Sequence, residues 1–217
     1  MKNLLITIIG NVASGKTTIT SLISKHLPAK KIPADELFRV NPFFPLAVKD
    51  RKRWSLASDL WFLYRRVEMT NEFSLGLRKT YILVDGGLPM SYVYAYSRLR
   101  SGFYTKDEWK LYTTYYKSLC KNILRSDLII SLEASVDFLQ SRIRKRGRAY
   151  EIKYFTDGYL LDLNKSLNSF KQNSKKTNTK LLSLNVEKLD LLYNRPTLQS
   201  ILKKIQANGR RAGPSSG

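Results

Sequence analysis

A glycine-rich segment near the start of the chain constrains the fold more than any other feature. Residues 4–9, LLITII, form an apolar and largely β-branched run that predicts a buried strand. Directly after it comes GNVASGKTT, whose residues in order are Gly10, Asn11, Val12, Ala13, Ser14, Gly15, Lys16, Thr17 and Thr18. The two glycines let the backbone bend tightly, and the free N–H groups of a following helix can bind phosphate oxygens. The order strand, glycine loop, helix predicts a P-loop that binds the phosphates of a nucleotide.

Two residues at the end of the motif supply its chemistry. The Lys16 ammonium can reach the β- and γ-phosphates, and the Thr17 hydroxyl can bind Mg²⁺. A glycine turn that only joins a strand to a helix would not require a lysine and a threonine at these positions. We therefore predict a nucleotide and Mg²⁺ as the cofactors of this segment.

Short apolar runs recur along the chain and alternate with segments of helical periodicity. After the first strand, the predicted strands lie at residues 30–34, 81–84, 128–132 and 181–184. The predicted helices lie at residues 16–27, 53–75, 89–101, 105–124 and 196–206, with a basic helix around residue 145. This alternation predicts an α/β fold of the three-layer P-loop NTPase type, with a five-stranded parallel sheet and helices on both of its faces.

A single domain accommodates this pattern. We expect the domain to comprise residues 1–206 and to contain an exposed linker at residues 171–179. Residues 207–217 are rich in glycine, serine and arginine, and we expect them to form a disordered tail.

Two predicted strands end in carboxylates. Glu36 follows the strand at 30–34, and Asp85 ends the strand at 81–84 and precedes two glycines. In parallel sheets the ligand crevice lies beyond the carboxyl ends of the strands, so both side chains are expected there. Glu36 is then a candidate general base, and Asp85 is a candidate partner for Mg²⁺.

The helix predicted at residues 53–75 carries two adjacent apolar stripes that we expect to face the core. One consists of Trp54, Ala57, Trp61 and Tyr64, and the other of Leu56, Leu60, Leu63 and Val67. Asp59 and the pair Arg65-Arg66 interrupt the pattern. Charged side chains that interrupt an apolar stripe mostly face solvent. We therefore expect Asp59, Arg65 and Arg66 to be exposed.

A basic segment follows the fourth predicted strand. It contains Arg142, Arg146 and Arg148 around Gly147. Such a run of charges is usually a solvated helix face. After a P-loop, however, we expect a lid at about residues 140–152, whose arginines close over the phosphoryl group that is transferred.

The overall charge is strongly positive. The chain has 38 Lys+Arg against 17 Asp+Glu, a formal net charge of +21. This charge favours polyanionic partners, but the basic residues are spread along the whole chain and no zinc-finger, RNP or basic-zipper signature occurs, so we do not expect a nucleic-acid partner. One cysteine and one histidine are too few for a zinc site, and no apolar run reaches transmembrane length. We expect no membrane partner and a cytoplasmic location.

Several segments together resemble the deoxynucleoside kinase family, which includes bacterial deoxyadenosine and deoxyguanosine kinases. The resemblance extends from Ile6 to about Asn194. It depends on the glycine loop, Glu36 followed by Asn41-Pro42, Lys52-Arg53-Trp54, DLIISL at 127–132, RIRKRGRAYE at 142–151, and Tyr159-Leu160 with Leu163. This combination is far more specific than the P-loop alone.

The resemblance implies transfer of the γ-phosphoryl group of ATP to the 5′-hydroxyl of a deoxynucleoside, in nucleotide salvage and in a homodimer. On the donor side it implies that Lys16 binds the phosphates and that Thr17 and Asp85 bind Mg²⁺. It further implies contacts to the adenine of ATP from Asn185 and Val186.

On the acceptor side the resemblance implies three functions. Glu36 takes the proton of the 5′-hydroxyl, and Glu151 accepts a hydrogen bond from the sugar 3′-hydroxyl. Arg142, Arg146 and Arg148 neutralise charge on the phosphates.

The sequence departs from the family pattern at three positions of the nucleoside site. Val48 stands where the family has a tyrosine for the 3′-hydroxyl, and Asp59 stands where it has a glutamine that pairs with the base. The motif Asp-Arg-Ser reads Asp85-Gly86-Gly87, so an arginine near the 5′-hydroxyl is absent; Arg98, Arg100 or a lid residue could replace it. Because an ionised Asp59 can only accept, it suits the N–H groups of guanine or an amino group, and we expect a purine.

Two other functions fit the same residues. One is a P-loop kinase for another small molecule or for a nucleoside monophosphate. The other is a basic P-loop protein associated with nucleic acid, for which the charge of +21 is the main argument. Glu36 and Glu151 argue against the second, because two carboxylates in the crevice would hinder polyanion binding.

Overall fold

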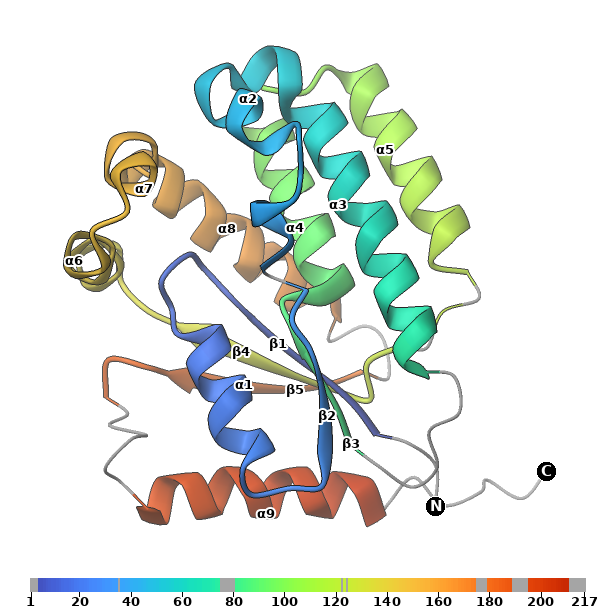
Figure 1. Cartoon of the computed structure of the whole chain (residues 1–217), viewed down its shortest axis with the longest axis vertical. Coiled ribbons are helices and arrows are strands. Elements are labelled where there is room, and N and C mark those ends of the chain that lie inside the picture. Colours follow the sequence, from blue (N-terminus) through green and yellow to red (C-terminus); the bar gives the residue numbers. More distant parts are fainter. Residues whose placement is uncertain are drawn as a thin grey trace.

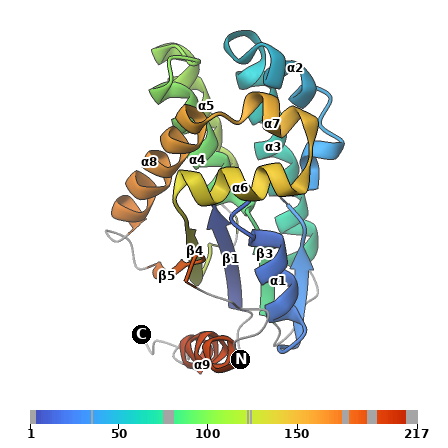
Figure 2. The same cartoon turned by 90° about the vertical axis from the view of Figure 1, so that its left-hand side faces the viewer.

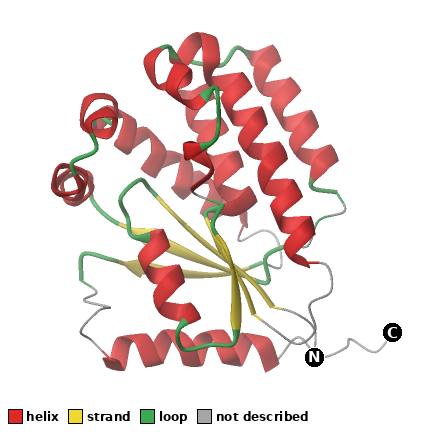
Figure 3. Ribbon diagram, in the orientation of Figure 1, coloured by secondary structure: helices red, strands yellow, loops and turns green. Residues whose placement is uncertain are grey.

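The computed structural model describes residues 4–34, 36–74, 81–121, 123, 125–174, 179–188 and 195–210. A five-stranded sheet crosses the middle of the molecule (Figures 1 and 3). Its strands are β1 (Leu4–Gly10), β2 (Ala29–Ile32), β3 (Tyr81–Asp85), β4 (Leu128–Glu133) and β5 (Lys180–Asn185). All neighbours are parallel, in the order β2-β3-β1-β4-β5. The predicted α/β fold with a five-stranded parallel sheet is confirmed.

The helices follow the predicted pattern, with differences at their ends. They are α1 (Lys16–Ser24), the 3-10 turn η1 (Glu36–Arg39), α2 (Phe44–Lys49), α3 (Arg51–Ser74), α4 (Gly87–Arg100), α5 (Lys106–Leu119), α6 (Val136–Arg146), α7 (Ala149–Tyr154), α8 (Asp157–Ser174) and α9 (Arg195–Arg210). Helix α9 continues four residues beyond the predicted domain end at 206, and residues 211–217 of the predicted tail lie outside the described residues.

The prediction of an exposed linker at residues 171–179 is wrong for its first four residues. Residues 171–174 form the last turn of α8, and the Lys171 Nζ donates to Glu133 Oε1 at 2.5 Å. A long-range contact at the end of β4 thus extends the helix beyond the point that the polar local sequence indicates. Residues 175–178 lie outside the described residues.

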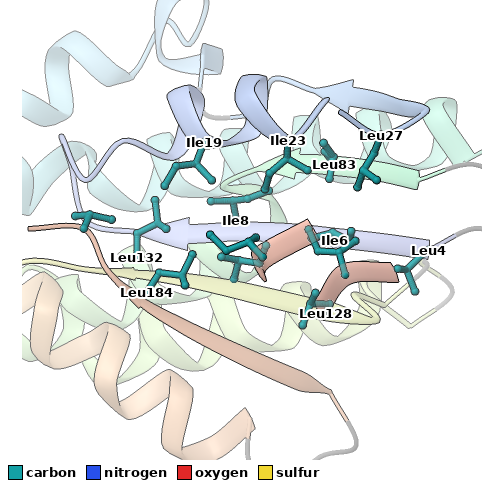
Figure 4. Packing of buried hydrophobic residues seen from close by; sticks show 14 residues of the cluster. Leu4, Ile6, Ile8, Ile19, Ile23, Leu27, Leu83, Leu128, Leu132 and Leu184 are labelled. Atoms are coloured by element: carbon teal, nitrogen blue, oxygen red, sulfur yellow. The ribbon is translucent and has the colours of Figure 1, made fainter. Parts of the chain in front are cut away.

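Helices cover both faces of the sheet. On one face α1 and α9 pack against the strands, and Figure 4 shows Ile19 and Ile23 of α1 over Ile8 of β1. On the other face α4 and α8 pack against β1 and β4, with Met90, Val93 and Leu163 fully buried. Helices α3 and α5 add a further layer against α4. The apolar strands predicted to be buried are therefore covered on both sides, as in other parallel sheets.

The long helix α3 faces the core with only one of its two predicted stripes. Leu63 and Val67 are buried, whereas Tyr64 of the other stripe is 51% exposed. The expectation that Asp59 and Arg66 face solvent is wrong, since they are only 6% and 3% exposed. They are seven residues apart and therefore share the face of Leu63.

Strand polarity places all candidate side chains at one edge. Because the strands are parallel, the loop after β1, Asp85 at the end of β3 and the turn η1 after β2 share the carboxyl edge of the sheet. Figure 2 shows α6 lying across this edge, above the loop between β1 and α1. Among the helices that the structure describes, none is both long and apolar enough to cross a membrane.

Candidate active site

The phosphate loop is a closely packed turn that requires glycine at two positions. Gly15 has φ 94°, a left-handed conformation that side chains disfavour. A Cβ atom on Gly10 would lie 2.5 Å from Ser14 Oγ and 3.1 Å from the Leu132 carbonyl oxygen, so only glycine fits there. Lys16 Nζ donates to the loop carbonyls of Gly10 and Asn11 at 3.2 and 3.1 Å. The ammonium is therefore aimed into the loop, where phosphate oxygens bind in P-loops.

Asn11 fixes the loop to α8. It is 1% exposed, and its Nδ2 donates to the Leu160 carbonyl and to Asn164 Oδ1, both at 2.8 Å. Asn164 in turn donates to the Ala134 carbonyl at 3.1 Å. These buried hydrogen bonds connect the loop after β1, the loop after β4 and α8, and they rigidify the backbone that would hold phosphates.

The predicted Mg²⁺ ligands lie together. The Thr17 hydroxyl of α1 donates to Asp85 Oδ2 at the end of β3 at 2.5 Å, and Asp85 is 2% exposed. Two adjacent oxygen ligands suit Mg²⁺, which commonly takes one or two protein oxygens and completes its shell with water and substrate phosphates. The described residues contain no group of three or more His, Cys, Asp or Glu side chains that could hold a metal.

A cationic pocket opens in front of the loop. Its side chains include no acid; it is lined by Ala13, Gly15, Lys16, Thr17, Thr18, Arg142, Lys145 and Arg146. The Arg142 guanidinium lies directly over the loop, 3.2 Å from where a Cβ atom of Gly15 would be. We call this the phosphate pocket, because its side chains and backbone suit phosphate oxygens only.

A second pocket, lined by more residues, lies between the loop, α3, α4 and the segment α6–α8. We call it the acceptor pocket. It is lined by Val12, Ala13, Lys16, Phe38, Phe44, Ala47, Val48, Arg51, Ser58, Asp59, Phe62, Arg66, Ser91, Tyr94, Arg98, Arg146, Arg148, Tyr150, Glu151, Phe155 and Tyr159. The two pockets share Ala13, Lys16 and Arg146. A molecule in one therefore meets a molecule in the other at the side chain of Lys16.

Glu151 is the centre of an ion cluster at the entrance of the acceptor pocket. It is 2% exposed and pairs with Arg146, with Arg148 Nη1 at 3.1 Å, and with the Tyr150 hydroxyl at 3.0 Å. The structure thus brings together three of the residues predicted for the lid. Burial, followed by the negative charge of Glu151, raises the pKa of Tyr150 to about 12. Tyr150 therefore stays a neutral donor to Glu151.

Asp59 forms a second cluster deeper in the acceptor pocket. The Tyr104 hydroxyl donates to Asp59 Oδ2 at 2.7 Å, and Arg98 Nε lies 3.9 Å from the same oxygen. Burial raises the pKa of the Asp59 carboxyl, against the opposing effects of Arg98, Tyr104 and Arg66. No described residue forms a hydrogen bond with the other oxygen, Oδ1, which leaves it for a ligand in the pocket.

Other predicted site residues lie outside both pockets. Glu36 is exposed on η1, with Arg39 Nε at 3.9 Å, and only its neighbour Phe38 lines the acceptor pocket. Asn185 accepts from the backbone N–H of Glu187 at 3.0 Å, and the side chain of Val186 is buried in the core. The structure therefore does not place Glu36, Asn185 or Val186 in either pocket. The roles that the resemblance implies for these three residues stay predictions.

Of the residues that could replace the arginine absent at position 86, Arg98 and the lid residue Arg146 line the acceptor pocket. Gly86 precedes α4 at the carboxyl edge, and Arg98 lies about 18 Å further along the helix axis. Arg100 is exposed and lines neither pocket. Arg146 lines both pockets, so it is the lid residue best placed to contact the 5′-hydroxyl side of an acceptor.

Sequence reasoning missed several pocket residues. Arg66 donates to Ser91 Oγ at 2.9 Å inside the acceptor pocket, and Arg51 lines it from the first residue of α3. The spacing of Asp59 and Arg66 on one helix face was an available signal, because two charges seven residues apart lie on the same side. An arginine at a helix N-terminus opposes the helix dipole, which was a signal for Arg51.

Comparisons with known proteins agree with this architecture. A sequence profile of the deoxynucleoside kinase family matches residues 6–208. The chain is 24% identical to deoxyadenosine kinase of Lactobacillus acidophilus over 94% of this chain and 95% of that protein. It is 26% identical to deoxyadenosine/deoxycytidine kinase of Bacillus subtilis, over 94% and 92%. The solved structure of deoxyadenosine kinase from M. mycoides with bound dCTP superposes with a TM-score of 0.78 at 25% identity, over 94% of this chain and 100% of that one. The chain therefore belongs to the deoxynucleoside kinase family and is a phosphotransferase of the nucleoside-kinase type.

Proposed function

We propose that the chain transfers the γ-phosphoryl group of ATP to the 5′-hydroxyl of a deoxynucleoside, with a purine as the preferred base. The observation that carries this proposal is the meeting of the two pockets at Ala13, Lys16 and Arg146. Phosphoryl transfer depends mainly on alignment and charge neutralisation, so donor and acceptor must share one point of contact. The phosphate pocket supplies only cations there, and the acceptor pocket supplies aromatic walls and two carboxylates.

In the proposed reaction the 5′-oxygen attacks the γ-phosphorus and the bond to the β–γ bridging oxygen breaks, so that ADP leaves. Lys16, Arg142, Arg146 and Arg148 neutralise the phosphate oxygens. Thr17 and Asp85 would hold Mg²⁺, which supplies further positive charge when bound. Glu36 takes the hydroxyl proton; because its carboxylate faces solvent, the proposal requires it to turn toward the acceptor when both substrates are bound.

The acceptor is oriented by the two carboxylate clusters. Glu151 is fixed by two arginines and Tyr150, which suits a carboxylate that accepts the sugar 3′-hydroxyl. Asp59 Oδ1 accepts from the base, and guanine offers N1–H and a 2-amino group on one edge. The same proposal includes a homodimer in the cytoplasm, a role in nucleotide salvage, and contacts of Asn185 and Val186 with adenine.

A transfer screen tests the proposal. ATP labelled in the γ-phosphate is incubated with each of the four deoxynucleosides, the ribonucleosides and the nucleoside monophosphates, with Lys16→Ala as the control. We expect label on the 5′-oxygen of a purine deoxynucleoside, lost in the control and strongly reduced in Glu36→Gln. Label on monophosphates alone would mean that the pocket serves another acceptor, and an unchanged rate in Glu36→Gln would exclude Glu36 as the base.

A further inference from the structure

The far end of the acceptor pocket contains two arginines that the proposed reaction does not use. Arg51 is the first residue of α3, and Arg98 is close to the end of α4. Both guanidinium groups lie over the ring of Tyr159, with distances of 4.5 Å and 5.6 Å to its centroid. The family pattern that we identified does not include either residue. The positions of both side chains in the pocket therefore need an explanation of their own.

The two arginines have only one carboxylate between them. Asp59 Oδ2 lies 3.9 Å from Arg98 Nε, and Arg51 forms no ion pair with any carboxylate that the structure describes. Arg98 Nε is buried without a hydrogen-bond partner among the described residues. Burial and the charge of Arg98 lower the pKa of Arg51. One of the two arginines is thus left without a carboxylate partner among the described residues.

Arg51 also has hydrogen-bonding capacity to spare. Its Nη2 donates to the Tyr154 carbonyl at 2.5 Å, which is its single hydrogen bond to the described residues. A guanidinium carries five N–H donors in a planar fork that matches phosphate or carboxylate oxygens. A positive charge in a partly buried position is unfavourable unless an anion pairs with it. The remaining donors and the unpaired charge fit the same kind of ligand group.

We propose that Arg51 and Arg98 form a subsite for an anionic group, a phosphate monoester or a carboxylate, on the molecule that occupies the acceptor pocket. The inference rests on the proposed function, because it assigns this group to the acceptor. Two positions on a deoxynucleoside can carry it. One is the sugar 3′-oxygen, since the Tyr154 carbonyl bound by Arg51 is one helical turn from Glu151. The other is the base, next to Asp59.

Equilibrium binding without ATP tests the subsite. Titration calorimetry compares three probes with the same pyrimidine or purine ring: a neutral deoxynucleoside, its 3′-monophosphate, and a deoxynucleoside with a carboxylate on the ring. The proteins are the wild type, Arg51→Gln, Arg98→Gln and Arg100→Gln. The last changes an exposed arginine on the same helix as Arg98, outside both pockets. Thermal unfolding of each variant shows whether it is folded.

We expect one anionic probe to bind roughly 10- to 100-fold more tightly than the neutral one, the range of a charge-assisted pair. Arg51→Gln and Arg98→Gln should bind the anionic and the neutral probe with similar affinity. Arg100→Gln should retain the wild-type preference for the anionic probe. Preference for the 3′-monophosphate assigns the subsite to the sugar, and preference for the ring carboxylate assigns it to the base. No preference for either probe, or a preference that survives in Arg51→Gln, overturns the subsite. If neutral deoxynucleosides still accept label from ATP in that case, the proposed function stands without it.

Discussion

The two pockets that meet at Lys16 handle charge in opposite ways. The phosphate pocket has four cationic side chains and no acid. In the acceptor pocket each carboxylate already has partners: Glu151 has Arg146, Arg148 and Tyr150, and Asp59 has Arg98 and Tyr104. The first pocket therefore attracts any polyphosphate by its positive charge, whereas the two carboxylates of the second are held in place by paired groups.

This difference indicates where affinity and where selectivity originate. Removal of a cation from the phosphate pocket weakens all donors alike. Removal of one member of a paired cluster leaves its partner unsatisfied, which changes stability and the choice of acceptor together.

Lys16→Ala should have the largest effect. Because Lys16 belongs to both pockets, its loss removes charge stabilisation at the point of transfer, and kcat/KM should fall by about 10²- to 10³-fold or more. Steady-state kinetics with labelled ATP measures this. Lys25→Ala, at the exposed end of α1, serves as the control. Equal losses in both variants would mean that general charge, not the position of Lys16, supports the reaction.

Glu151→Gln should affect stability and acceptor binding together. The buried carboxylate pairs with two arginines that are about one third exposed, so solvent screening limits the loss to about 1–2 kcal/mol. We also expect the KM for the acceptor to rise about 10-fold or more, with a smaller change for ATP. Urea unfolding and kinetics measure both. Glu68→Gln breaks a more exposed pair with Arg65 and should destabilise the fold less than Glu151→Gln.

Tyr104→Phe should shift the pH dependence of acceptor binding. The hydrogen bond from Tyr104 lowers the pKa of Asp59, which burial raises overall, so its removal should raise that pKa further. An acceptor whose N–H groups bind the ionised carboxylate loses affinity when Asp59 becomes protonated. In Tyr104→Phe this loss should therefore begin at a higher pH than in the wild type. Acceptor KM measured between pH 4 and 8 in both proteins checks this. Identical profiles would exclude Asp59 as a ligand of the base.

Asp59 should also leave a signature in the pH dependence of stability. Its pKa in the folded chain lies above the unfolded value of about 4, so the folded chain binds the proton more tightly in that window. The contribution of Asp59 to the free energy of unfolding therefore decreases as the pH rises from about 4. The slope should be absent in Asp59→Asn. A slope of the same size in the variant would assign it to other groups.

Lys171→Met should have the smallest effect, because it changes neither pocket. Burial alone would raise the pKa of Glu133, but hydrogen bonds from Lys171 and Ser183 lower it below its usual value. The pair therefore stabilises the fold above the unfolded pKa of Glu133, and this is lost as the pH falls through the folded value. We expect a loss of at most about 1 kcal/mol at pH 7 and unchanged kcat/KM. A large loss of activity would show that α8 transmits changes to the phosphate loop.

The two pockets also differ in how much of each could be predicted from the sequence. The phosphate loop consists of consecutive residues, and strand polarity alone brings Thr17 and Asp85 together across 68 positions. The acceptor pocket is assembled from side chains of α3, α4 and α6–α8, whose relative positions depend on helix packing. Tyr104 reaches Asp59 from a loop after α4, and no local pattern in the sequence indicates this contact. The seven-residue spacing of Asp59 and Arg66 indicated only that both share one face of α3, and not which side chain Asp59 contacts.

The most direct test of the account is the affinity of a bisubstrate compound, adenosine joined through its 5′-oxygen and a chain of five phosphates to the 5′-oxygen of deoxyguanosine. If the two pockets meet at Lys16 and Arg146, both halves bind at once. The compound should then bind more than about 10²-fold more tightly than ATP or deoxyguanosine alone. Arg146→Ala should remove most of this gain. Binding no tighter than that of ATP, with an unchanged value in Arg146→Ala, would show that the acceptor pocket does not receive a nucleoside next to the phosphate pocket.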